Sequence, residues 1–101
     1  MEDSRIVELY WQKNADAIKE TNSKYGAYCF AIADNILHNK EDSEECVNDT
    51  WLNAWNAMPP QKPTKLQMFL AKITRNLSFN RFNARSAEKR GGGEIVLVLD
   101  E

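Results

Sequence analysis

The sequence predicts an all-α protein, a compact bundle of four to five helices with a long basic helix at its C-terminal end. Apolar residues recur at spacings of three and four, the period of an amphipathic helix, and strand signals are nearly absent before the last residues. Glycine (4) and proline (3) are scarce, and all three prolines lie within 59–63. With 101 residues, 43% of them hydrophobic, the chain suits one domain with one modest core.

Three helices are expected in the first part of the chain. A helix over 3–13 has its apolar residues on one face, namely Ile6, Val7, Tyr10 and Trp11. Asn14 suits the N-cap of a second, short helix, and the weak helix formers at 21–23 predict a break after it. A third helix over 26–37 has little polar surface and is expected to form the centre of the core.

A fourth helix is expected to begin at Asp42, because its carboxylate can accept hydrogen bonds from the first backbone N–H groups. Glu45 follows three residues later, as in a capping box. The apolar stripe of this helix consists of Val47, Trp51, Ala54, Trp55 and Met58. The prolines that follow predict a stiff, extended loop over 59–63.

A long fifth helix is expected over 64–90. Thr64 and Gln67 can form a second capping box at its start, and three glycines at 91–93 end it. Its apolar stripe consists of Leu66, Phe69, Leu70, Ile73 and Leu77. The apolar run with acidic ends at 94–101 is typical of the start of a linker, so the predicted domain covers 1–93.

Charge is divided along the chain, although the total is only −2. Residues 1–57 contain five basic and eleven acidic residues, a net −6, whereas 58–93 contain eight basic residues and one acidic residue, a net +7. The segment 94–101 contributes −3. This division indicates two partners of opposite charge, or one assembly that presents both charges.

The residue types that catalysis or metal binding needs do not occur in a suitable pattern. His38 is the one histidine and is expected at a helix end, so no nucleophile has a credible base partner. Cys29 and Cys46 lack the spacing and the neighbours of a zinc site and are expected to be small buried apolar residues. The chain is therefore not expected to be an enzyme, and no cofactor is expected.

Targeting and membrane signals are also missing from the sequence. No apolar run approaches the length that spans a bilayer. The N-terminal segment is acidic and amphipathic, unlike a signal or transit peptide. The expected location is therefore the cytoplasm.

The basic fifth helix is the first candidate binding surface. Lysine and arginine neutralise phosphates, asparagine can hydrogen-bond base edges, and aromatic rings can stack on unpaired bases. The helix combines these residue types, with Phe79 and Phe82 interleaved among them. The candidate DNA-binding residues are Lys65, Lys72, Arg75, Asn76, Asn80, Arg81 and Arg85. The simpler alternative is a solvated basic face with two core phenylalanines.

The acidic face of the fourth helix is the second candidate surface. Glu44, Glu45, Asn48 and Asp49 fall outside the apolar stripe and could dock a protein. The alternative is that the carboxylates only complement the helix macrodipole and aid solubility. The remaining aromatic residues in this part of the chain have helical spacing, which favours a core over a ligand site; they are Tyr28, Phe30, Trp51 and Trp55.

Three segments together resemble region 2 of bacterial sigma-70-family RNA polymerase sigma factors, of the extracytoplasmic-function type. They are DSEECVNDTWLNAW (42–55), the proline loop, and FLAKITRNLSFNRFNARSAEKR (69–90). The positions that match in order and spacing are Asp42, Glu44, Glu45, Asn48, Asp49, Trp51, Ala54, Trp55, Phe69, Leu70, Ile73 and Asn76. With the upstream helix included, the resemblance covers nearly the whole chain.

The resemblance implies a role for each charged surface. The acidic helix would dock on the clamp helices of the polymerase β′ subunit through Glu44, Glu45, Asn48 and Asp49. The basic helix and the loop before it would recognise the promoter −10 element and help to melt it. Asn76 would hold a base of the non-template strand out of the stack, and loop 59–65 would determine which base is accepted. Lys72, Arg75, Asn80, Arg81 and Arg85 would contact backbone or bases.

The resemblance also implies partners beyond this chain. Relatives continue after a linker into a second helical DNA-binding domain, and many are held by an anti-sigma factor. The expected partners are therefore the polymerase core, the non-template strand of the −10 element and an anti-sigma factor, and the isolated domain is expected to be a monomer. Two other functions stay open, a protein–protein interaction module and a stand-alone DNA-binding regulator.

Overall fold

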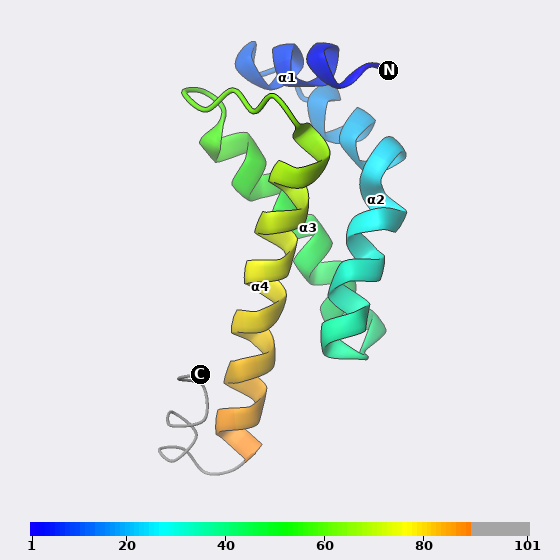
Figure 1. The fold of residues 1–101 in the computed structure, drawn as a ribbon, viewed down its shortest axis with the longest axis vertical. Helices are drawn as coiled ribbons and strands as arrows, with labels where there is room; N and C mark the ends of the chain where they lie inside the picture. Colours follow the sequence, from blue (N-terminus) through cyan, green and yellow to red (C-terminus); the bar gives the residue numbers. More distant parts are fainter. Residues whose placement is uncertain (90–101) are drawn as a thin grey trace.

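The computed structural model describes residues 1–89, with side chains as far as Arg85. This part of the chain forms four helices: α1 (Asp3–Trp11), α2 (Asp16–Leu37), α3 (Lys40–Ala57) and α4 (Leu66–Lys89). The long helices α2, α3 and α4 lie side by side, and α1 crosses one end of them (Figure 1). The predicted all-α class and the long C-terminal helix are confirmed. The glycines at 91–93 and the expected linker at 94–101 lie outside the described residues.

The core lies where α1 meets the three long helices. Ile6 and Tyr10 of α1 are fully buried there, together with Cys29 of α2 and Leu70 of α4. Helix α3 contributes most of its predicted apolar stripe, with Val47, Trp51, Ala54 and Met58 buried and Trp55 partly buried. Both cysteines are buried and free, as expected from the sequence.

Two aromatic residues predicted on buried helix faces are exposed instead. Trp11 is 40% exposed and Tyr28 is 38% exposed, so neither is part of the buried cluster. Phe79 and Phe82 are exposed as well, which overturns the alternative of two core phenylalanines. Helical spacing alone could not exclude these residues, because it fixes which side chains share a face but not where that face meets another helix.

The expected break at 21–23 is wrong, since α2 is one continuous helix from Asp16 to Leu37. Thr21 is fully buried, and its hydroxyl donates to the carbonyl oxygen of Ala17 at 2.7 Å. That hydroxyl also lies 2.8 Å from the hydroxyl of Tyr10. Because the buried contacts to α1 outweigh the weak helix propensity of this triplet, the helix continues through it.

The expected starts of the next two helices are also displaced. The N-cap of α3 is Asn39, whose side-chain oxygen accepts from the backbone N–H of Asp42 at 2.9 Å. Asp42 is thus in the third helical position, and its carboxylate is free to contact α4. Helix α4 begins at Leu66 rather than at Thr64.

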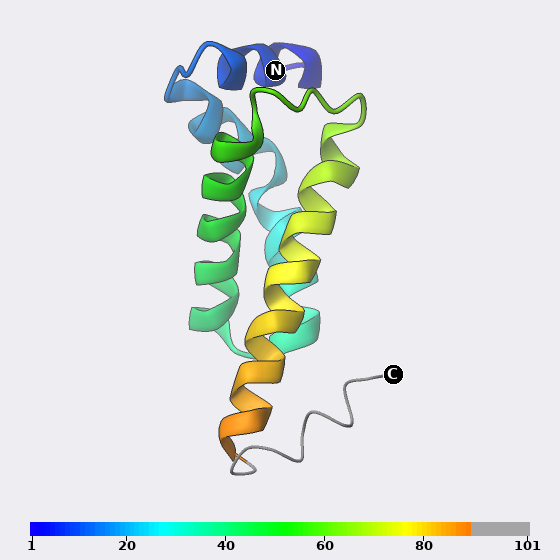
Figure 2. The same cartoon turned by 90° about the vertical axis from the view of Figure 1, so that its left-hand side faces the viewer.

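The loop that joins α3 to α4 runs beside α1 at one end of the bundle (Figure 2). Met58 is completely buried at its start, and the loop surface around Pro60–Lys62 is exposed. Within residues 1–89, no helix is both long enough and apolar enough to span a membrane.

Candidate nucleic-acid interface and acidic docking surface

The solvent-facing side of α4, here called the outer face, combines basic, amide and apolar side chains. Lys72 lies four residues after Met68, and Arg75 and Asn76 lie three and four residues after Lys72. Phe79 lies four and three residues after those two, so all five share one side of the helix. All five are exposed, including Met68 at 64% and Phe79 at 47%. Exposed apolar side chains among cations suit stacking against unpaired bases together with phosphate neutralisation.

A depression lies where the outer face meets the end of the loop. Its loop side is formed by Pro63, Thr64 and Lys65, and its helix side includes Lys72 and Asn76. Met68, Phe69 and Arg75 complete the lining. Four of the seven candidate DNA-binding residues therefore meet at one place: Lys65, Lys72, Arg75 and Asn76.

Sequence reasoning missed the apolar part of this depression. Phe69 was assigned to the core stripe, and Met68 had no assigned role, yet both line it. The signal that could have found Met68 is its spacing of four from Lys72 and of eight from Asn76, which places an apolar side chain on a polar face.

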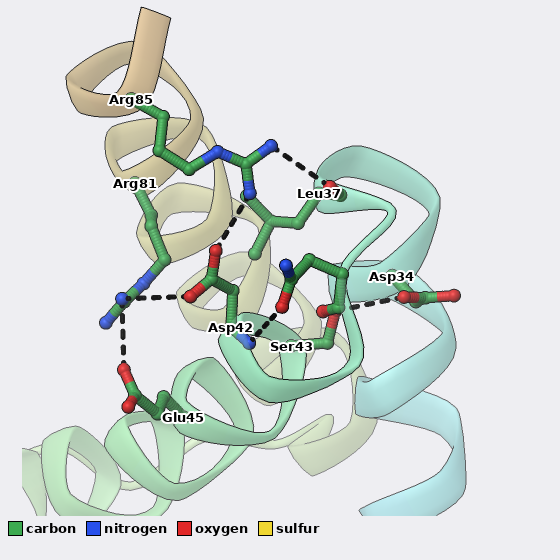
Figure 3. A network of polar contacts seen from close by, with 8 residues as sticks. Asp34, Leu37, Asp42, Ser43, Glu45, Arg81 and Arg85 are labelled. Atoms are coloured by element: carbon green, nitrogen blue, oxygen red, sulfur yellow. Dashed lines mark hydrogen bonds and ion pairs between the residues drawn. The ribbon is translucent and has the colours of Figure 1, made fainter. Parts of the chain in front are cut away.

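Arg81 and Arg85 lie on a different side of α4 and contact α3 (Figure 3). Arg85 donates from Nη1 to Oδ2 of Asp42 at 2.8 Å and from Nη2 to the carbonyl oxygen of Leu37 at 3.2 Å. Arg81 Nη1 lies 3.0 Å from Oε1 of Glu45 and 3.6 Å from Oδ1 of Asp42. The structure therefore separates these two arginines from the four residues at the depression.

The charge of Arg81 is stabilised where it lies. Burial by itself would lower the pKa of its guanidinium, but Cys46 and the carboxylates of Glu45 and Asp42 outweigh that effect, so the pKa is raised above its ordinary value. Asn80 lies near it, lining a second depression between α3 and α4 with Arg81, Cys46 and Asp49. Asn80 is thus closer to the α3 contact than to the loop depression.

The acidic docking surface consists of Glu44, Glu45, Asn48 and Asp49 on α3. The first three are exposed and Asp49 is half-buried, so the whole set is accessible on one helix. Leu52 lies four residues after Asn48 and is 55% exposed. Sequence reasoning missed this residue, although a leucine outside the apolar stripe was the available signal. An exposed apolar side chain among carboxylates is typical of a protein contact surface.

The fold and these two surfaces define a helical binding domain with an acidic face on α3 and a basic face on α4. Within residues 1–89, no cluster of three or more potential metal ligands is present.

The chain belongs to the Sigma-70 region 2 family, whose model matches residues 23–88. Searches of curated proteins and of solved structures found no match. Family membership implies a sigma-factor role in promoter recognition and transcription initiation, with RNA polymerase core and promoter DNA as partners. It also makes the domain non-enzymatic, which agrees with the sequence-based expectation.

Proposed function

We propose that this chain is region 2 of a sigma factor of the extracytoplasmic-function type, acting in the cytoplasm. It docks on the β′ clamp helices of RNA polymerase through the acidic docking surface of α3. It recognises the promoter −10 element through the outer face of α4 and the loop before it. It helps to melt this element by binding the separated strand, without breaking a covalent bond, and so it selects where the polymerase opens the duplex.

The observation that carries this proposal is the exposed amide of Asn76 in a depression bounded by the loop and by cations. Taking a base out of the stack costs on the order of a few kcal/mol. A depression that accepts the extruded base offsets this cost through hydrogen bonding and stacking. Lys65, Lys72 and Arg75 line the same depression as Asn76, and they neutralise the phosphates of the separated strand.

Arg81, Arg85 and Asn80 have a less direct part in this proposal. The two arginines are paired with carboxylates of α3, so they reach DNA along the edge of α4 or after those carboxylates are displaced. Asn80 is exposed beside them. An anti-sigma factor is a further proposed partner, since it would need to cover the same acidic or basic surfaces. The free domain is proposed to be a monomer.

Single-stranded −10 oligonucleotides, varied one base at a time, test the DNA part of the proposal. We expect Asn76→Ala to weaken binding most for one preferred base, and Lys72→Ala to weaken binding equally for all sequences while reducing the salt slope by about 1. Asn35→Ala is the control, because Asn35 is exposed on α2 and does not line the depression. If Asn76→Ala lowered the affinity equally for all bases, Asn76 would contact the phosphate backbone and would not recognise a base.

A pull-down with β′ clamp helices tests the docking part. We expect Glu44→Lys and Asp49→Lys to reduce binding at least tenfold, roughly 1.4 kcal/mol or more, because each reverses a charge on the docking surface. Glu8→Lys on α1 makes the same charge change elsewhere and should bind normally. Normal binding by both α3 variants would contradict docking through this surface and favour the alternative function, a protein–protein interaction module with another partner.

A further inference from the structure

The loop between α3 and α4 has few hydrogen bonds of its own. Its prolines at 59, 60 and 63 have no N–H group to donate. Among the described residues, its backbone hydrogen bonds are those from Met58 N to Ala54 O, from Gln61 N to Ala57 O and, at its end, from Phe69 N to Lys65 O. Contacts from elsewhere in the molecule therefore have to define its position.

Two side chains at the end of α1 make such contacts. Trp11 donates from Nε1 to the carbonyl oxygen of Gln61 at 2.9 Å. Lys13 donates from Nζ to the carbonyl oxygens of Trp55 and of Met58, the latter at 3.0 Å. The Lys13 ammonium also lies 4.7 Å from the ring centroid of Trp55, within the range of a cation–π contact. Three backbone carbonyls, at the end of α3 and in the loop, thus accept hydrogen bonds from the side chains of Trp11 and Lys13.

The backbone conformation of Lys13 is unfavourable for lysine, which indicates that its side chain has a role at this position. Lys13 has φ 55°, in the left-handed region. Lys13 N donates to Tyr10 O and Asn14 N to Leu9 O, which is the Schellman pattern at a helix end, where glycine is the usual residue. A lysine in this conformation carries backbone strain that glycine would avoid. Its ammonium reaches the C-terminal end of α3, which has no basic residue in its own last turn.

The held loop forms part of the depression that contains Asn76. Pro63 and Thr64 line that depression on one side. The same two residues also line a separate depression on the α1 side of the loop, together with Ser4 and Val7. A shift of the loop relative to α1 would therefore alter the shape of the surface beside Asn76.

We propose that Trp11 and Lys13 are positioning residues that fix the loop and thereby determine which base the depression accepts. Neither residue touches the base; each acts through the backbone of residues 55–61. Both lie outside the segment 23–88 that matches the family model. The inference rests on the proposed function, because it assumes that the loop reads a base.

The test compares base preference rather than affinity alone. The 101-residue chain is titrated with single-stranded −10 oligonucleotides that differ at one position, and the ratio of Kd for the worst and the best base is measured. Trp11→Phe keeps an aromatic ring and removes the N–H donor. Lys13→Gly removes the ammonium and relieves the left-handed backbone. His38→Gly is the matched control, because His38 has φ 50° at the C-terminal end of α2, and that end of α2 lies at the opposite end of the bundle from the loop (Figure 1).

We expect the Kd ratio to fall by about fivefold or more in the Trp11→Phe/Lys13→Gly double variant and to stay unchanged in His38→Gly. The far-UV circular dichroism spectrum of the double variant should remain that of the folded helical domain. An unchanged ratio, or an equal loss of affinity for all bases, would overturn the inference while leaving the proposed function intact. Unfolding of both single variants would overturn it as well, since the contacts would then serve stability only. A wild-type chain without any base preference would instead overturn the proposed reading by the loop, and the inference with it.

Discussion

Arg81 and Glu45 form an ion pair between α4 and α3, with Nη1 of the arginine 3.0 Å from Oε1 of the glutamate. One residue belongs to the proposed DNA-binding set and the other to the proposed polymerase-docking set. Under the proposed function, docking of Glu45 on the polymerase and contact of Arg81 with DNA would each compete with this ion pair. The proposal therefore predicts that a change at one surface affects binding at the other.

Glu45→Gln should strengthen binding to single-stranded DNA, because it removes a carboxylate from beside Arg81 and leaves the guanidinium available to phosphate. We expect a gain of about two- to threefold at low salt, consistent with one additional phosphate contact. Stability should change by less than about 0.5 kcal/mol, since the side chain of Glu45 is 62% exposed. Fluorescence anisotropy measures the binding.

Glu44→Gln is the matched control for that measurement. It makes the same change in net charge one residue earlier, and Glu44 forms no ion pair among the described residues. Equal gains in the two variants would mean that overall charge, not release of Arg81, causes the effect.

Asp42→Ala should destabilise the α3–α4 contact at the end that lies away from the connecting loop. Asp42 accepts from Arg85 at 2.8 Å and lies 3.6 Å from Arg81, so its loss leaves two arginines without this partner. Because both arginines are partly exposed, we expect a loss of about 1 kcal/mol in the free energy of unfolding, smaller at high salt. Urea unfolding at two salt concentrations measures it. Glu41→Ala, in the same first turn of α3, removes the helix-dipole contribution alone and should cost less.

Thr50→Val should destabilise the middle of the same contact. The Thr50 hydroxyl donates to Cys46 O at 2.7 Å, so it accepts its other hydrogen bond from Thr74, whose Oγ1 is 2.8 Å away. Both residues are fully buried, and the single variant leaves Thr74 without this partner, at a cost of about 1–2 kcal/mol.

The Thr50→Val/Thr74→Val double variant provides the complementary measurement. Replacing both buried hydroxyls by methyl groups leaves neither member of the pair unmatched, so the double variant should be more stable than the sum of the single losses predicts. Strict additivity in a urea double-mutant cycle would show that the two hydroxyls do not interact.

Stability at high pH should depend on Tyr25, which joins α2 to α1. Burial, and then the carboxylate of Asp3 that accepts its hydrogen bond, raise the pKa of Tyr25 to about 12. A raised pKa in the folded state stabilises the protein fully below the ordinary value of 10.0, and this stabilisation is lost as pH rises through about 12. Tyr25→Phe should lack that part of the alkaline decline, as measured by the free energy of unfolding across this range.

Stability at low pH should depend on Asp3 in the opposite direction. Burial alone would raise the pKa of this carboxyl, but hydrogen bonds from Lys24 and Tyr25 outweigh burial and lower the pKa below its ordinary value of 3.8. The resulting stabilisation is present above that value and is lost as pH falls through the lowered pKa. Asp3→Asn should therefore flatten the acid limb of the stability profile, and an unchanged limb would contradict this account.

The fold was largely predictable because its strongest signals are local. The spacing of Val47, Trp51 and Ala54 identifies the buried face of α3, and the outcome agrees with it. The prediction of a break at 21–23 was wrong for a non-local reason, since the buried Thr21 is hydrogen-bonded to Tyr10 on another helix. The predicted start of α3 was wrong because Asn39 and Asp42, three residues apart, could each cap a helix, and the cap is Asn39.

By itself the sequence determined the helical class, the opposed charges of the two faces and the place of Asn76 on a basic helix, since each follows from residue type and spacing along the chain. Tertiary structure alone decided that Arg81 and Arg85 turn toward Asp42 and Glu45, and that Trp11 and Lys13 hold the loop. The physical reason is distance along the chain: Arg85 and Asp42 are 43 residues apart and Trp11 and Gln61 are 50 apart. No periodicity within one helix carries information about a partner on another, so these contacts arise only when the helices pack.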